Sequence, residues 1–322
     1  MVKNIGSLIY VKLQSLIWIE SGKGPSNVVH DSTSERIKNI IKSKKKTSTL
    51  VIDCKRVREI ANYAIEDITD AIQSVRSKGK DCEVILINAD KIKNRLEKTV
   101  EGVPVKYFSE EVESFIARIG APELVNVDSV HDRVREIEEE LLTSLLSDSF
   151  KKWDESERLP STPVKSTGVF DARYIISKPK CFAWLSTLLA DKVENIITNE
   201  LVAAEPKLLA VSLRASPLAA AVGNLLEYDI EVVDHLGPVQ NLMVRKDARR
   251  YDSRSVYFYI GDFAIGGTEI KNAATFVQLV GKHMAGAVTI GSALDESEYD
   301  FKFPFTSLVR LSKVRDDVEY KF

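Results

Sequence analysis

The sequence has few of the residues that mark several classes of protein. Its 322 residues include three cysteines and four histidines, and the net charge is only −2. Cys54, Cys82 and Cys181 are odd in number and lack metal-ligand spacing, so we expect buried thiols in a reducing compartment. A charge this close to balance creates no global field for nucleic acid or an anionic membrane. Any polyanion site must therefore be local.

Long apolar runs and familiar catalytic motifs are also missing. Residues 1–22 alternate polar and apolar side chains, which predicts neither a signal peptide nor a membrane span, and we expect a cytoplasmic protein. His235 and His283 belong to no motif and form no cluster with carboxylates, so we predict no protein-bound metal. No motif of serine or cysteine nucleophilic catalysis is found.

The composition is that of a globular protein, with 44% hydrophobic and 29% charged residues, and the length suits two domains. Residues 1–124 have an α/β pattern of their own. Strands are predicted at 7–13, 15–21, 49–55 and 83–89, and helices at 31–45, 63–79 and 109–120. We expect one small mixed sheet with helices packed on it.

Part of this first domain carries the run LVIDCKRVREIANYAIEDITDAIQSVRSKGKDCEVILINADKIKNRLEK. Over residues 48–98 it resembles the STAS domain, the sulfate-transporter and anti-sigma-antagonist module. Phosphorylatable members have a serine that caps the helix after the strand and turn, whereas this chain has Asn62 and Tyr63 there. The resemblance therefore implies a regulatory domain for protein interaction or dimerisation rather than a phosphorylation switch.

Residues 125–158 are predicted to be an amphipathic helix followed by a linker. The helix is expected over residues 126–153, and residues 154–168, which are charged and then rich in Pro, Ser and Thr, are expected to form a loop. The helix either connects the domains and pairs subunits, or packs on the domain that follows. Its apolar stripe consists of Val130, Val134, Ile137, Leu141, Leu142, Leu145 and Phe150.

Residues 159–322 alternate strands and helices, which predicts a parallel sheet with its ligand site at the carboxyl ends of the strands. A strand at 208–211 ends in the turn SLRAS, and a helix begins near Pro217. Free N–H groups at a helix start make an anion pocket. The residues of this turn are Ser212, Leu213, Arg214, Ala215 and Ser216.

Two further segments belong to the same predicted site. The stretch NLMVRKDARRY collects Arg245, Lys246, Arg249 and Arg250, and VYFYIGDFAIGGTEI then repeats the order strand, loop, helix. We expect the basic cluster and the two loops to converge at one edge of the sheet.

The stretch GDFAIGGT, at residues 261–268, resembles the D-D-V-I-T-A-G-T loop of type I phosphoribosyltransferases. The likeness is to the orotate branch over residues 164–311. It implies that Asp262 binds the ribose hydroxyls of phosphoribosyl pyrophosphate and that the loop after it wraps the 5′-phosphate. The loop residues are Ala264, Ile265, Gly266, Gly267 and Thr268.

The same resemblance implies roles for the other two segments. SLRAS matches the pyrophosphate loop, and RKDAR matches the orotate enzymes' R-K-x-x-K with Arg249 in place of a lysine. Asp262, Arg245, Lys246 and Arg249 would then be the catalytic residues. Magnesium would enter with the pyrophosphate of the substrate.

Two departures from the family pattern leave three functions open. Gly261 replaces the first acid, and residues 250–260 are fewer than the mobile loop that covers the substrate in active members. The chain is therefore a regulator or sensor that binds phosphoribosyl pyrophosphate or a nucleotide, an active magnesium-dependent transferase, or a different chemistry in the same pocket. We also expect a homo-oligomer and a protein partner for the first domain.

Overall fold

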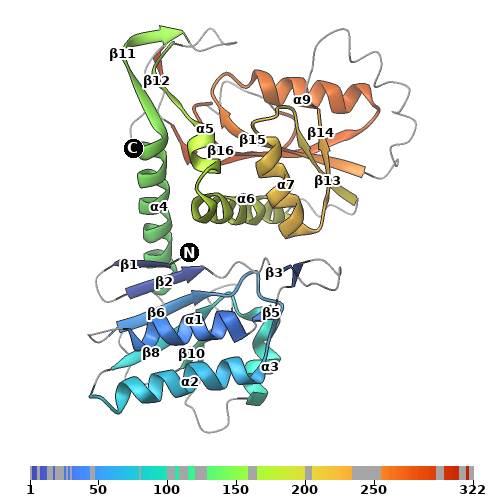
Figure 1. Ribbon diagram of the computed structural model, residues 1–322. Helices are drawn as coiled ribbons and strands as arrows, with labels where there is room; N and C mark the ends of the chain where they lie inside the picture. Colours follow the sequence, from blue (N-terminus) through green and yellow to red (C-terminus); the bar gives the residue numbers. More distant parts are fainter. Residues whose placement is uncertain are drawn as a thin grey trace. The chain divides into compact units, whose positions relative to one another are not determined.

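A computed structural model gives the fold of the chain (Figure 1). It describes residues 2–5, 8–12, 17–18, 25–26, 28–29, 31–43, 48–79, 81–99, 106–108, 115–119, 129–158, 165–199, 205–233, 255–294, 301–311 and 317–318. The chain divides into two compact units, residues 1–141 and residues 142–322. Within the described ranges, no helix has the length and apolar character needed to cross a membrane.

Unit 1, residues 1–141, is built on a mixed sheet in the order β1-β2-β6-β8-β10-β9. The inner strands β2, β6 and β8 are parallel, and the outer strands are antiparallel to their neighbours. Two further strand pairs are short, β3 with β4 and β5 with β7. The bounds are β1 (Val2–Ile5), β2 (Leu8–Lys12), β3 (Ile17–Trp18), β4 (Pro25–Ser26), β5 (Val28–Val29), β6 (Ser48–Asp53), β7 (Glu59–Ile60), β8 (Cys82–Ile87), β9 (Lys106–Phe108) and β10 (Ile116–Ile119).

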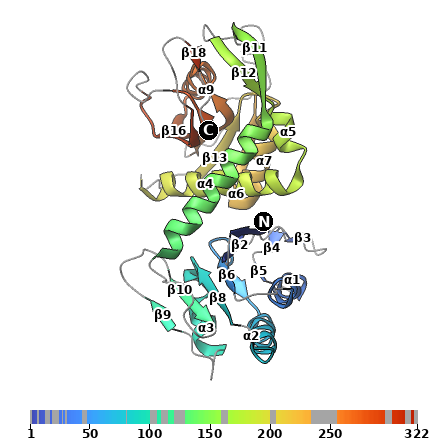
Figure 2. The same cartoon turned by 90° about the vertical axis from the view of Figure 1, so that its left-hand side faces the viewer.

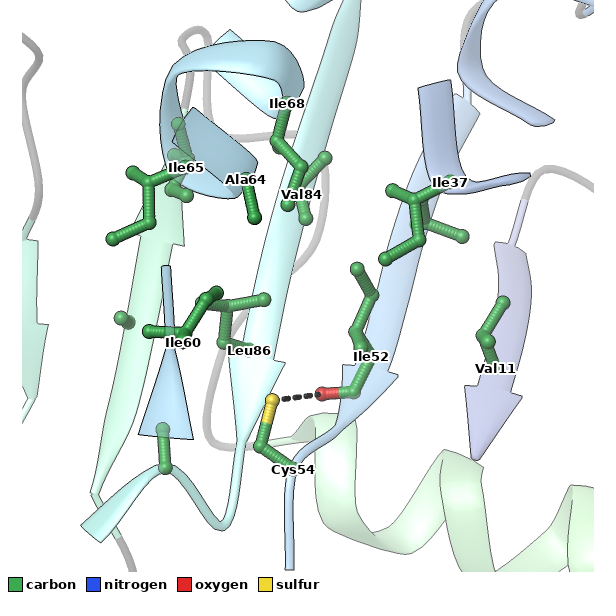
Figure 3. Packing of buried hydrophobic residues seen from close by; sticks show 14 of the residues in the cluster. Val11, Ile37, Ile52, Cys54, Ile60, Ala64, Ile65, Ile68, Val84 and Leu86 are labelled. Atoms are coloured by element: carbon green, nitrogen blue, oxygen red, sulfur yellow. Dashed lines mark hydrogen bonds between the residues drawn. The ribbon is translucent and has the colours of Figure 1, made fainter. Parts of the chain in front are cut away.

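One face of this sheet carries α1 (Asp31–Lys42) and α2 (Asn62–Arg76), which lie together in both views (Figures 1 and 2). A 3-10 turn, η1 (Asp90–Ile92), and α3 (Lys93–Thr99) follow β8. Figure 3 shows Ala64 and Ile68 of α2 pointing at Val84 of β8, and the buried Cys54 thiol donating to the Ile52 carbonyl. Burying each large aliphatic side chain contributes about 1.5–3 kcal/mol. The helical spacing of apolar residues in α2 thus fixes its buried face.

The opposite face of the sheet packs against the first part of α4 (Val130–Ser149). Val130, Val134 and Ile137 join the sheet residues Tyr10 and Ile85 in one buried cluster. Over residues 130–137 the apolar stripe of the predicted amphipathic helix therefore packs on the sheet of unit 1. This buried part of the stripe is no argument for subunit pairing.

Two predictions of secondary structure are wrong. Residues 116–119, predicted as the end of a helix, form β10, because Arg118 is buried with its Nε 3.3 Å from Glu83 Oε2 on the neighbouring β8. Residues 150–158, predicted as the end of one helix and the start of a loop, instead form the strand β11 (Phe150–Arg158). This strand is antiparallel to β12 (Lys165–Phe170). Both segments are strands because they pair with a neighbouring strand, and this pairing cannot be predicted from the local sequence pattern.

Unit 2, residues 142–322, contains a five-stranded sheet in the order β14-β13-β15-β16-β17. Every neighbouring pair is parallel, so the predicted parallel α/β sheet is confirmed. A smaller sheet has the order β11-β12-β18. The bounds are β13 (Glu205–Ala210), β14 (Asp229–Val232), β15 (Ser255–Ala264), β16 (His283–Ser292), β17 (Phe305–Arg310) and β18 (Asp317–Val318).

Helices cover both faces of the five-stranded sheet (Figure 1). One face carries α9 (Thr268–Leu279), whose Ile270, Ala273 and Val277 pack on Tyr257 and Tyr259 of β15. The other face carries α6 (Pro179–Asn199) and α7 (Ser216–Leu226), and the short α5 (Ala172–Ile176) precedes α6. This layering leaves the carboxyl ends of the strands at one edge, where the loops lead into the helices.

Candidate functional site

The two predicted phosphate loops start from neighbouring strands. β13 and β15 pair in parallel, with Leu209 opposite Tyr259. Continuing this register past the strand ends brings Ser212 level with Asp262. Both chains then turn into helices, α7 and α9, at the same edge of the sheet.

The turn after β13 is held by its own first residue. The Ala215 amide donates to Ser212 Oγ at 3.2 Å, and the Ser216 amide donates to the Ser212 carbonyl at 3.1 Å. Ser216 is the first residue of α7, whereas the side chains of Leu213 and Arg214 are exposed. The turn therefore has a fixed backbone and a cationic side chain at its surface.

The loop after β15 ends in Gly267, which has a φ of +66° and precedes the first residue of α9. No side chain caps this helix start, so its first amides are open to a ligand anion. The Ala264 carbonyl accepts from the Ala293 amide at 2.9 Å, which ties the loop to the segment after β16. Ile265 and Gly266 are half-buried, and Thr268 is exposed.

Asp262 lies near the end of β15 with its carboxylate held by the backbone. The Phe263 amide donates to Asp262 Oδ1 at 2.8 Å. Burial raises the pKa of Asp262 above its ordinary value, and backbone hydrogen bonds together with the Arg214 charge offset part of that rise. A desolvated carboxylate of this kind is suited to accept hydrogen bonds from a ligand.

A second carboxylate, which the sequence analysis did not identify, belongs to Glu269 in the first turn of α9. The Tyr259 hydroxyl donates to Glu269 Oε2 at 3.1 Å. Burial raises the pKa of Glu269, and the nearby Asp262 charge raises it further, while Tyr259, Ser212 and Arg214 oppose the rise. The Tyr259 bond links the start of α9 to the strand before the loop.

The position of Gly261 is filled by a different side chain. A Cβ at Gly261 would lie 2.5 Å from the Tyr259 hydroxyl oxygen and 2.7 Å and 2.8 Å from two ring carbons. The ring of Tyr259 therefore occupies the space of the missing acid. Two signals could have pointed to this pair, because Glu269 directly follows Thr268 and Tyr259 lies two residues before Gly261 on the same side of the strand.

Other predicted site residues fall elsewhere. Arg245, Lys246 and Arg249, with the neighbouring Arg250, lie outside the described residues. Among the residues with described positions, no group of three histidine, cysteine, aspartate or glutamate side chains could hold a metal ion. His283 is exposed at the amino end of β16, at the strand edge opposite the loops.

Comparison with known proteins gives no match to any family model and none to a curated protein sequence. Solved structures to which the chain is similar include orotate phosphoribosyltransferase from Aeropyrum pernix. It has 14% identity and a TM-score of 0.39, over 52% of this chain and 93% of that one.

Two more solved structures are similar at the same level. Adenine phosphoribosyltransferase from Trypanosoma brucei has 12% identity and a TM-score of 0.37, over 52% of this chain and 79% of that one. UMP synthase from Leishmania donovani has 13% identity and a TM-score of 0.42, over 88% of this chain and 55% of that one.

Proposed function

We propose that unit 2 binds phosphoribosyl pyrophosphate or a nucleoside 5′-monophosphate, and that the protein acts as a regulator or sensor. The observation that carries this proposal is the meeting of the two loops, which leave the neighbouring parallel strands β13 and β15 with Ser212 level with Asp262. The sequence resemblance assigns one loop to pyrophosphate and the other to the 5′-phosphate. A ribose held between them would face Asp262.

Each part of the ligand has matching groups in unit 2. The open amides at the start of α9 and the Thr268 hydroxyl suit a phosphate dianion, and Arg214 suits the pyrophosphate. The carboxylates of Asp262 and Glu269 are oxygen donors of the type that Mg²⁺ prefers. Magnesium bound with the pyrophosphate would offset its negative charge. Arg245, Lys246 and Arg249 are proposed to contribute to the same site.

The alternative function is an active magnesium-dependent phosphoribosyltransferase that joins a nucleobase to the ribose and releases pyrophosphate. In that reaction the bond from ribose C1 to pyrophosphate breaks and a bond to a ring nitrogen of the base forms. Asp262 would hold the sugar while positive charge develops on it. The short connection at residues 250–260 favours the regulator, because active relatives close a longer loop over the substrate.

Unit 1 is proposed to be the STAS-like interaction module through which a regulator would act. A homo-oligomer and a protein partner of this unit stay predictions. Its sheet and helices form a core separate from that of unit 2, as an independent module requires.

Calorimetric titration of the full chain with phosphoribosyl pyrophosphate and Mg²⁺ tests the binding. Thr268→Ala should weaken binding by about 1–2 kcal/mol through loss of a charge-assisted hydrogen bond. Asp262→Asn should also weaken it. The matched control is Thr275→Ala on the exposed side of α9, whose hydroxyl donates to the Lys271 carbonyl. Full affinity in both site variants would contradict the proposal.

A further inference from the structure

Gly261 and Glu269 belong to one arrangement of side chains. The Tyr259 hydroxyl lies 2.5 Å from the point where a Cβ at Gly261 would be, and it donates to Glu269 Oε2 at 3.1 Å. An acid at position 261 would project into the space that the phenol now fills. The Glu269 carboxylate lies directly beyond that phenol, so a carboxylate is brought back to this region from the next element.

The partners of Glu269 come from the residues proposed to face the ligand. Its carboxylate accepts from Tyr259 at 3.1 Å, and it is close enough to Ser212 of the first loop, to Asp262 and to Arg214 for these groups to act on its pKa. Both residues are half-buried rather than sealed in the core. A ligand at this edge of the sheet would meet Asp262 and Glu269 together.

We propose that Glu269 replaces the missing acid of the ribose site, so that Asp262 and Glu269 accept hydrogen bonds from the two neighbouring hydroxyls of a ribose 5-phosphate. Tyr259 is the positioning residue that holds the Glu269 carboxylate. This inference rests on the proposed function. Each sugar hydroxyl has one proton to donate, and an ionised carboxylate only accepts, so two hydroxyls are matched by two carboxylates.

The pair of carboxylates predicts which sugars unit 2 should prefer. A deoxy sugar leaves one desolvated carboxylate without its hydrogen bond, and this unpaired group costs binding free energy. Unit 2 should therefore prefer ribose over deoxyribose. A purely structural Glu269 would act through the dipole of α9, and its loss would lower stability and affect both sugars alike.

The test is titration of the full chain with ribose 5-phosphate and with its 2-deoxy and 3-deoxy analogues, which avoids any assumption about the base. Native protein should bind the ribose compound most tightly. Glu269→Gln should weaken that binding by about 5- to 20-fold and abolish discrimination at one hydroxyl, because a neutral acceptor makes a weaker bond. Asp262→Asn should abolish discrimination at the other hydroxyl.

Matched variants separate positioning from general damage. Tyr259→Phe should reduce discrimination at the same hydroxyl as Glu269→Gln. Tyr257→Phe should not, although it also removes a phenol that donates to a glutamate, Glu231, at 2.8 Å. If Glu269→Gln keeps the native preference at both hydroxyls while Asp262→Asn loses discrimination at one of them, the role of Glu269 is overturned. If native protein binds none of these sugars, nor phosphoribosyl pyrophosphate, the proposed function itself fails.

Discussion

At the scale of single residues, unit 2 keeps two carboxylates in an unfavourable setting. Burial raises the pKa of both Asp262 and Glu269, and the Asp262 charge raises that of Glu269 further. Structural carboxylates usually have a cation as their main partner, whereas here Glu269 accepts a hydrogen bond from the neutral Tyr259 hydroxyl. Such a pair is costly without a ligand, which is typical of sites that gain free energy when a ligand binds.

A pH-dependent stability follows for Glu269. Its raised pKa means that the folded chain binds a proton more tightly than the unfolded chain, so the folded state loses stability as pH rises through that range. Without ligand, Glu269→Gln should therefore stabilise unit 2 at pH 7 by about 1 kcal/mol. A change of that size raises the melting temperature by roughly 2–4 °C for a unit of this length.

Thermal unfolding followed by circular dichroism at pH 7 and at pH 4 would measure this. The gain should shrink at pH 4, where the native glutamate takes up its proton. Glu205→Gln, an exposed glutamate at the amino end of β13, is the control and should change neither value. A lower melting temperature at pH 7 would mean that the hydrogen bond from Tyr259 outweighs the desolvation.

At the scale of elements, the sequence was sufficient where a pattern is local. The helix that became α2 and the order of strand, loop and helix from β15 to α9 were predicted from the sequence. β10 was missed because Arg118 is stabilised there by Glu83 of another strand. Glu269 was missed for a related reason, since its partner Tyr259 belongs to the strand before the loop. Contacts between different elements decide both cases.

The anchoring of α4 on unit 1 gives a prediction at this scale. Lys12 Nζ lies 3.0 Å from Asp53 Oδ2 and 3.1 Å from Glu138 Oε1 of α4, and Tyr10 donates to Glu138 at 2.8 Å. Burial alone would raise the pKa of Asp53, but the Lys12 charge and hydrogen bonds from Asn88 and the Lys55 amide lower it overall. The buried ion pair thus contributes stability that is lost as pH falls through that lowered pKa.

Asp53→Asn should destabilise unit 1 by about 3–5 kcal/mol, because it leaves the buried Lys12 with less compensation. Glu138→Gln should cost less, since Glu138 is partly exposed and Lys12 keeps Asp53. Urea unfolding at pH 7 is the measurement. Asp132→Asn on the exposed side of α4 is the control, because its side chain is 74% exposed. Equal stability of Asp53→Asn and the control would contradict a supporting role for this ion pair.

At the scale of the whole molecule, α4 belongs to both units. Residues 130–141 of this helix lie in unit 1, where they pack on the sheet, and residues 142–149 lie in unit 2. A signal that passes from a ligand in unit 2 to unit 1 could act through the stability of this helix. A regulator needs such coupling, whereas a transferase needs only the site in unit 2.

Hydrogen exchange on the full chain, with and without phosphoribosyl pyrophosphate and Mg²⁺, separates the two functions. Ligand at 100 times its Kd stabilises the unit that binds it by about 2.7 kcal/mol, so amides of residues 205–233 and 255–294 should be protected in either case. For a regulator, protection should also change at residues 130–141 and in the sheet of unit 1. Incubation with a panel of nucleobases should then release no pyrophosphate.

The Asp262→Asn chain, which should bind weakly, is the control. It should show neither the change in amide protection nor any release of pyrophosphate. The regulator would be overturned if protection were confined to residues 142–322 and pyrophosphate were released in a base-dependent way that Asp262→Asn abolishes. The ligand would then be consumed at its site without any effect on unit 1, which would establish the transferase.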